Sequence, residues 1–197
     1  IIKPETEVPN EDHLDAQFEE GEEPANVFDA AAGGALTGMK LAMNIGAMLI
    51  AFIALIALLN GIIGGTAGLF GFEGLTLELI LGYVFAPLAW LLGTPWQDAI
   101  ATGSLIGQKL VLNEFVAYVE FVKIKETLSD QAQVVAIFAL CGFANLSSIA
   151  ILLGGLGGLA PERRPDIARM GLKAVAAGSL SNLMSAVLAG LFISLGA

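Results

Sequence analysis

Charge is scarce in this sequence, and cysteine is almost absent. Only 14% of the 197 residues are charged, while 56% are hydrophobic and the mean hydropathy is +0.77. A typical soluble domain carries about 25% charged residues. The single cysteine, Cys141, excludes an internal disulfide framework and is expected to be a small packed residue. The composition therefore argues against a soluble domain and favours a membrane protein.

The charges that are present are unevenly distributed. Ten of the 19 acidic residues lie within the first 29 residues, where Lys3 is the only base, and the remainder of the chain is almost neutral. Nucleic-acid binding requires clustered Lys and Arg, so no nucleic-acid partner is expected. The sequence also lacks a metal-ligand cluster, a phosphate-binding loop and a nucleophile elbow, and no acid–base pair stands out. It therefore predicts a protein that is not an enzyme.

The beginning of the chain is unusual, because it has neither an initiator Met nor a signal peptide. We interpret the chain as a fragment of a longer protein or as one half of a split chain. Residues 1–37 are predicted to form an acidic cytoplasmic loop that ends in a short interfacial helix, capped by Asn26 or Asp29.

The clearest membrane-spanning signal is Leu41–Leu59, which contains one polar side chain, Asn44, and no charge. A helix needs roughly 20 such residues to cross a hydrocarbon core about 30 Å thick. We therefore expect a transmembrane helix within residues 38–64, and we expect the glycines from Gly61 to Gly74 to break it. Residues 65–95 contain boundary-favouring aromatics and predict an outer interfacial helix.

Residues 96–124 combine two apolar arms, Ala99–Ile106 and Phe115–Val122, with a polar centre. Each arm is too short to cross a bilayer alone, so a re-entrant helical hairpin is predicted. Residues 131–160 are long enough to span, but a polar run at Gly142–Ser148 predicts a broken helix.

The final helix is predicted at residues 172–196. The densest cluster of basic residues precedes it or lies in its first turn, which places this end in the cytoplasm: Arg163, Arg164, Arg169 and Lys173. The predicted fold class is an all-α, multi-pass membrane protein with a re-entrant hairpin and a broken helix.

Glu114 carries the strongest functional signal. A carboxylate in hydrocarbon costs several kcal/mol, so it must face a cavity or a partner. One interpretation is an ion pair with Lys109 or a position near water, and the other is a ligand for a cation or for two adjacent hydroxyls. Asn145 and Ser148 lie three residues apart, on one face of a helix or at its broken end, and fit either hydroxyl binding or helix–helix hydrogen bonding. Phe143 could contact a planar base or simply pack.

Three segments resemble the motifs of concentrative nucleoside transporters: Gly107–Tyr118 (GQKLVLNEFVAY), Cys141–Ala150 (CGFANLSSIA) and Ser179–Ser185 (SLSNLMS). The resemblance covers essentially the whole chain and matches the C-terminal half of the family, a scaffold helix followed by the second of two inverted repeats. It implies a homotrimeric elevator transporter in the bacterial inner or plasma membrane. The cargo would be nucleosides of the uridine, cytidine and adenosine class, in symport with sodium or, alternatively, protons.

The same resemblance implies roles for individual residues. Glu114, Asn145 and Ser148 would hold the ribose, Phe143 would lie near the base, and Asn113 and Lys109 would support the site. The base-reading residues and the sodium site would lie in an N-terminal half that this sequence lacks, so no metal ligand or covalently bound cofactor is expected here. The competing hypothesis is a structural or assembly subunit without its own substrate site.

Overall fold

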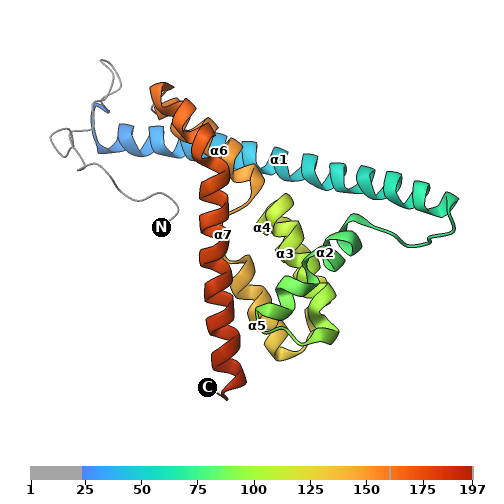
Figure 1. The fold of residues 1–197 in the computed structure, drawn as a ribbon. Helices are drawn as coiled ribbons and strands as arrows, with labels where there is room; N and C mark the ends of the chain where they lie inside the picture. The colour runs from blue at the N-terminus through green and yellow to red at the C-terminus, as the bar shows by residue number, and fades with distance from the viewer. Residues whose placement is uncertain (1–23, 160, 197) are drawn as a thin grey trace. The chain divides into compact units, whose positions relative to one another are not determined.

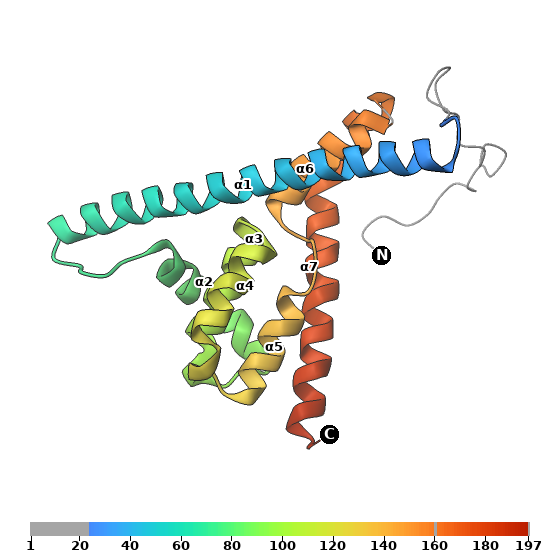
Figure 2. The ribbon, with the colours of Figure 1, turned by 180° about the vertical axis from the view of Figure 1, so that it is seen from behind.

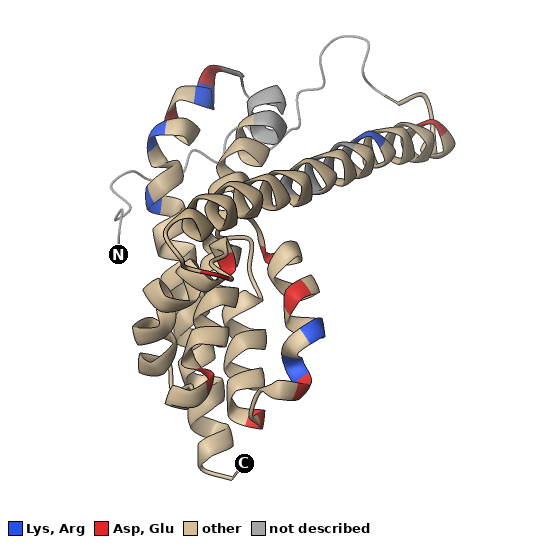
Figure 3. Cartoon of the chain, turned by 90° about the vertical axis from the view of Figure 1, so that its right-hand side faces the viewer, with Lys and Arg blue, Asp and Glu red and all other residues tan. Residues whose placement is uncertain are grey.

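The computed structural model describes residues 24–159 and 161–196, apart from the side chains at positions 41, 44, 45, 48, 49, 52, 154–159 and 161. The chain divides into two units, Ile1–Phe52 and Ile53–Ala197. Within the described part every regular element is a helix. Figure 3 shows these helices as predominantly uncharged along their length.

Helix α1 (Val27–Leu69) begins at the cap that the sequence predicts, but it is one continuous helix where the sequence predicts a short interfacial helix followed by a separate span. The Asn26 side-chain oxygen accepts hydrogen bonds from the backbone N–H groups of Phe28 (2.9 Å) and Asp29 (3.0 Å). The predicted break at Gly61–Gly74 is wrong over its first half, because the helix continues through these glycines to Leu69. A glycine costs only about 1 kcal/mol in a helix interior, whereas a break in an apolar segment would leave backbone groups unpaired.

A polar contact ties the end of α1 to the start of α2 (Leu77–Leu91). The Asn60 amide donates to both carboxylate oxygens of Glu78 (3.0 and 2.9 Å), and its oxygen accepts from the Leu77 N–H (2.7 Å). The Thr76 hydroxyl caps α2 by accepting from the Leu79 N–H. These bonds satisfy helix-end donors that an apolar environment would otherwise leave unpaired.

After α2, a short 3-10 turn (Trp96–Asp98) leads into α3 (Ala99–Val111), and α4 (Glu114–Ile124) follows after two residues. Figures 1 and 2 show α2, α3 and α4 as neighbours. A side chain at Gly103 would come within 2.7 Å of the α2 backbone at Phe85 and Ala86, so glycine permits the close approach of α2 and α3. The helical arms of the predicted hairpin are therefore present, and α3 extends further than predicted.

A second 3-10 turn (Lys125–Thr127) precedes the predicted broken helix. This region consists of α5 (Asp130–Leu140) and α6 (Leu146–Leu159), separated by residues 141–145. Asp98 fixes the start of α5, because its carboxylate accepts from the Ser129 hydroxyl (2.6 Å) and N–H (3.2 Å). Apolar side chains from α3, α4 and α5, including Leu105, Phe121 and Leu140, form one buried cluster.

Helix α7 (Arg164–Ser194) follows a third 3-10 turn (Pro161–Arg163) and starts eight residues before the predicted final helix. Its first turn is stabilised by Asp166, which pairs with Arg163 (3.3 Å) and Arg169 (2.7 Å). The predicted basic loop is thus largely the first turns of a helix. Among the described residues, α7 is the one helix that is long and apolar enough to cross a membrane; part of the predicted span Leu41–Leu59 lies outside the described side chains.

Candidate functional site

The short link between α3 and α4 places Glu114 at a helix N-terminus. Leu112 leaves the helical conformation (φ −103°, ψ −94°), and Asn113 caps α4 by accepting from the Val116 N–H at 2.9 Å. Glu114 then occupies the first turn of α4, where the helix dipole favours a negative charge. Asn113, predicted as a supporting residue, therefore fixes the position of the helix that carries the carboxylate.

The interruption between α5 and α6 presents Asn145. Its side-chain oxygen accepts from the Ser148 N–H (2.8 Å) and the Ser147 hydroxyl (2.7 Å), as a helix cap does. These two bonds orient the side chain, so that its amide nitrogen points away from α6. Asn145 is only 1% exposed, and this orientation decides what its remaining donor can reach.

A hydrogen bond connects Glu114, after the α3–α4 link, with Asn145, in the interruption between α5 and α6. The Asn145 amide nitrogen donates to Glu114 Oε2 at 2.8 Å, although the residues are 31 positions apart. Within the part of the chain that the structure describes, no hydrogen bond to Glu114 Oε1 is found. One carboxylate oxygen is therefore held by the amide, and the other is available as an acceptor.

Two further predicted residues lie close to this pair. Ser148 is buried and donates its hydroxyl hydrogen to the Asn145 carbonyl at 2.6 Å, which leaves its oxygen lone pairs as acceptors. Lys109 is 2% exposed on α3 and lies near enough to Glu114 for an electrostatic interaction. The structural-subunit hypothesis predicts that Glu114, Asn145 and Ser148 are each buried against other helices, with no shared cavity. The structure links the three residues by hydrogen bonds through Asn145.

Phe143 lies in the same interruption, and 67% of its surface is exposed. It lines a cavity of about 260 Å³ together with Ser148 of α6 and small residues of α7 such as Gly171 and Gly178. The cavity is mostly apolar, with Ser148 as a polar group on its wall. The structure thus places an exposed aromatic ring and the predicted serine around one space.

Asn182 is a residue of this region to which the sequence assigned no role. Its side-chain amide, on α7, donates to the Cys141 carbonyl, and the Cα atom of Gly142 lies directly beside it. The motif Ser179–Ser185 drew attention to this stretch of α7. No sequence signal pairs it with a residue 41 positions earlier.

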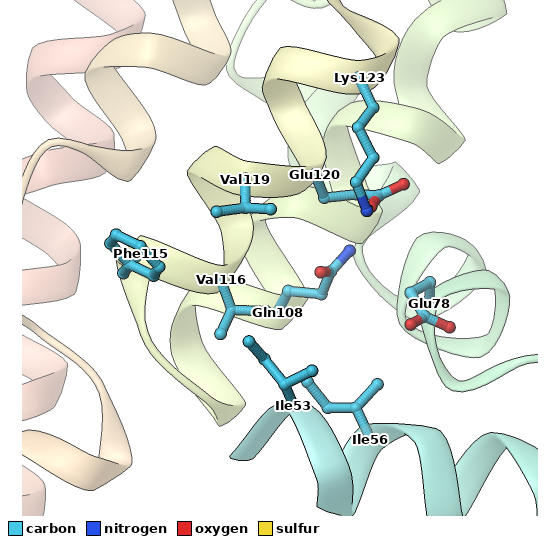
Figure 4. Close-up of a pocket in the computed structure, with 9 residues that line it drawn as sticks. All are labelled: Ile53, Ile56, Glu78, Gln108, Phe115, Val116, Val119, Glu120 and Lys123. Atoms are coloured by element: carbon cyan, nitrogen blue, oxygen red, sulfur yellow. The ribbon is translucent and has the colours of Figure 1, made fainter. Parts of the chain in front are cut away.

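A second cavity, of about 170 Å³, is lined by other residues, among them Gln108 and Phe115, the chain neighbours of Lys109 and Glu114 (Figure 4). Its charged residues already have partners: Glu120 pairs with Lys123 at 2.8 Å, and Glu78 pairs with Asn60. Among the described residues, no group of three His, Cys, Asp or Glu side chains is placed to hold a metal ion. The unpaired carboxylate oxygen of Glu114 remains the more distinctive chemical feature.

Comparison with known proteins identifies similar sequences and folds. A family profile described as "Na+ dependent nucleoside transporter C-terminus" matches residues 1–190. The uncharacterized transporter YutK of Bacillus subtilis is 61% identical over 193 residues, covering 98% of this chain and 48% of YutK. The nucleoside permease NupC of Helicobacter pylori is 47% identical over 202 residues, covering 100% of this chain and 47% of that permease.

The fold has a close counterpart among solved structures. CNTnw in an inward-facing substrate-bound state superposes with a TM-score of 0.82 at 59% sequence identity, over 91% of this chain and 44% of CNTnw. The chain therefore spans about half the length of the relatives that it matches.

Proposed function

This chain belongs to the family of Na+-dependent nucleoside transporters, and from that premise we propose that it supplies the ribose-binding half of a sodium–nucleoside symporter. Members of the family are membrane transporters and not enzymes. The proposed cargo is a nucleoside of the uridine, cytidine or adenosine class. A complete transporter would require an N-terminal half that contributes the base-reading residues and the sodium site.

The pairing of Glu114 with Asn145 supports ribose binding most strongly. A ribose diol offers two adjacent hydroxyl donors, and a carboxylate is an acceptor with two oxygens. Glu114 Oε1 is available, and Oε2 is already oriented by the Asn145 amide at 2.8 Å. Hydrogen bonds to a charged acceptor contribute about 1.5–3 kcal/mol each, so the diol would be a large part of the binding free energy.

The remaining site residues fit the same ligand. Ser148 offers acceptor lone pairs beside Asn145, and Lys109 interacts electrostatically with the half-buried Glu114 carboxylate. The exposed ring of Phe143 would pack against the nucleobase, because planar aromatic faces stack favourably. We assign the ribose to Glu114, Asn145 and Ser148, and the approach of the base to Phe143.

The proposed transport mechanism involves no covalent chemistry. Sodium and nucleoside binding would shift a two-state equilibrium between conformations that face opposite sides of the membrane. In this scheme α3 and α4 form a re-entrant hairpin, α5 and α6 a broken helix, and the transport domain moves as an elevator against a trimeric scaffold that includes α1. The polar groups of site and ligand would satisfy each other during the crossing, which lowers the cost of moving them through the membrane.

Uptake by the complete transporter that contains this chain tests the proposed function. We expect proteoliposomes with an inward sodium gradient to accumulate labelled uridine, and excess unlabelled adenosine to compete. Replacing sodium with choline should reduce accumulation by about tenfold or more, since the driving ion is then absent. Equal uptake with either cation, driven instead by a pH gradient, would contradict sodium coupling. Failure to take up or bind any nucleoside would contradict the proposal as a whole.

A further inference from the structure

The end of α5 poses a hydrogen-bonding problem. A helix leaves its last carbonyl groups without intrahelical partners, and in an apolar environment each unpaired group is costly. After Leu140 the chain turns tightly, with the Gly142 N–H donating to the Leu140 carbonyl at 2.7 Å. The Cys141 carbonyl oxygen instead accepts a hydrogen bond from a side chain of α7.

That partner is Asn182. Its amide nitrogen donates to the Cys141 carbonyl, and its side chain fills the space beside the Cα atom of Gly142. A methyl group at position 142 would overlap the Asn182 amide. Gly142 does not have a positive φ angle, so the close approach, and not an unusual backbone conformation, is what requires glycine here.

The contact extends along one face of α7. Gly178, one helical turn before Asn182, lies against Ala144: a Cβ atom at position 178 would come within 2.9 Å of the Ala144 Cβ. Gly178 and Asn182 therefore pack against residues 141–144, which immediately precede Asn145. This packing determines the position of Phe143 and of the backbone that leads to Asn145.

We infer that Asn182 is a positioning residue of the ribose site, and that Gly142 provides the space for its amide. The inference rests on the proposed function, because it concerns the placement of the same Asn145 side chain. Asn182 fixes the position of residues 141–145 through one hydrogen bond. These residues in turn place the Asn145 amide within hydrogen-bonding distance of Glu114. Losing that bond should weaken nucleoside binding while leaving the helices themselves in place.

The test uses the complete transporter with four variants: Asn182→Ala, Asn182→Asp, Gly142→Ala and the double variant Gly142→Ala/Asn182→Ala. Asn182→Asp keeps the volume but removes the amide donor, so it should raise the nucleoside KM about five- to twentyfold, as Asn182→Ala should. The maximal rate per transporter should change less. Ser181→Ala, an exposed neighbour on the same helix, serves as the control and should behave as wild type.

The double variant tests the contact itself. Gly142→Ala alone should lower uptake at least about tenfold, since the methyl group collides with the Asn182 amide. Removing that amide in the double variant should restore part of the uptake and raise the melting temperature above that of Gly142→Ala. A wild-type KM for both Asn182 variants, or a double variant no better than Gly142→Ala, would overturn the inference.

The outcomes also separate this inference from the proposed function. If Glu114→Gln abolishes binding while the Asn182 variants bind normally, only the positioning role fails. If the complete transporter binds no nucleoside, the proposed function fails. The melting temperatures of Gly142→Ala and the double variant would still decide whether Asn182 and Gly142 are in contact.

Discussion

Replacing Glu114 with glutamine is expected to weaken nucleoside binding by roughly 30- to 150-fold, the equivalent of about 2–3 kcal/mol. Glutamine keeps the size of the side chain but has one acceptor oxygen in place of two and carries no charge. If that oxygen still accepts from Asn145, no acceptor remains for the second ribose hydroxyl. Uptake at low nucleoside concentration, measured in membranes with equal amounts of transporter, should fall by the same factor.

Glu120→Gln is the matched control for this prediction. Glu120 lies on the same helix, α4, but its carboxylate pairs with Lys123 and not with Asn145. An exposed ion pair of this kind contributes about 0–1 kcal/mol. The control should therefore keep near-normal uptake. Wild-type uptake by Glu114→Gln, with the control also normal, would remove Glu114 from the site.

The second large effect is expected for Asn145→Asp. This change is isosteric, yet it places a second carboxylate where the amide donated to Glu114 at 2.8 Å. Two carboxylates this close in a low-dielectric site cannot both be ionised, and juxtaposed like charges cost several kcal/mol. We expect nucleoside affinity to fall by at least about 100-fold, accompanied by a lower melting temperature.

The exchange variant Glu114→Gln/Asn145→Asp shows whether the two side chains face each other. Here the glutamine amide can donate to the new aspartate, which reverses the direction of the original hydrogen bond. The melting temperature should recover above that of Asn145→Asp, because the like-charge contact is gone. Additive effects of the two substitutions would show that the side chains do not interact.

Much of the helical framework could be predicted from local sequence. The polar run Gly142–Ser148 marks the interruption between α5 and α6, and Glu114 marks the start of α4. Both signals are local, because a capping side chain and its backbone partner lie three residues apart. The same spacing predicts that Asn145 and Ser148 lie on one face of a helix or at its broken end, and the capping bond between them places both at the start of α6.

Two errors of the sequence-based prediction concern where a helix begins or ends. The run of glycines after Asn60 predicts a break, yet α1 continues to Leu69, because backbone hydrogen bonding outweighs the low helix propensity of glycine in an apolar segment. The sequence also predicts too late a start for α7, although Pro165 and Asp166 in its first turn are residues that favour a helix start.

Long-range contacts account for what the sequence could not predict. In the sequence, Asn182 looks like an ordinary polar residue in a helix of small residues. Its role depends on packing against a segment 41 positions earlier in the chain. The glycine at position 142 has the same explanation, because only the folded chain shows what occupies the adjacent space. The Glu114–Asn145 hydrogen bond connects the α3–α4 link with the interruption between α5 and α6, and the sequence of each segment alone indicates only a polar helix cap.

The central claim is that the Glu114 carboxylate binds the ribose diol, and comparison of uridine with 2′,3′-dideoxyuridine tests it most directly. Dissociation constants for both ligands should be measured in the wild-type transporter and in Glu114→Gln. We expect the wild type to prefer uridine by about 30-fold or more, and we expect the preference in the variant to shrink to about threefold or less. The same preference in both proteins would contradict the claim, because the hydroxyls would then be recognised elsewhere.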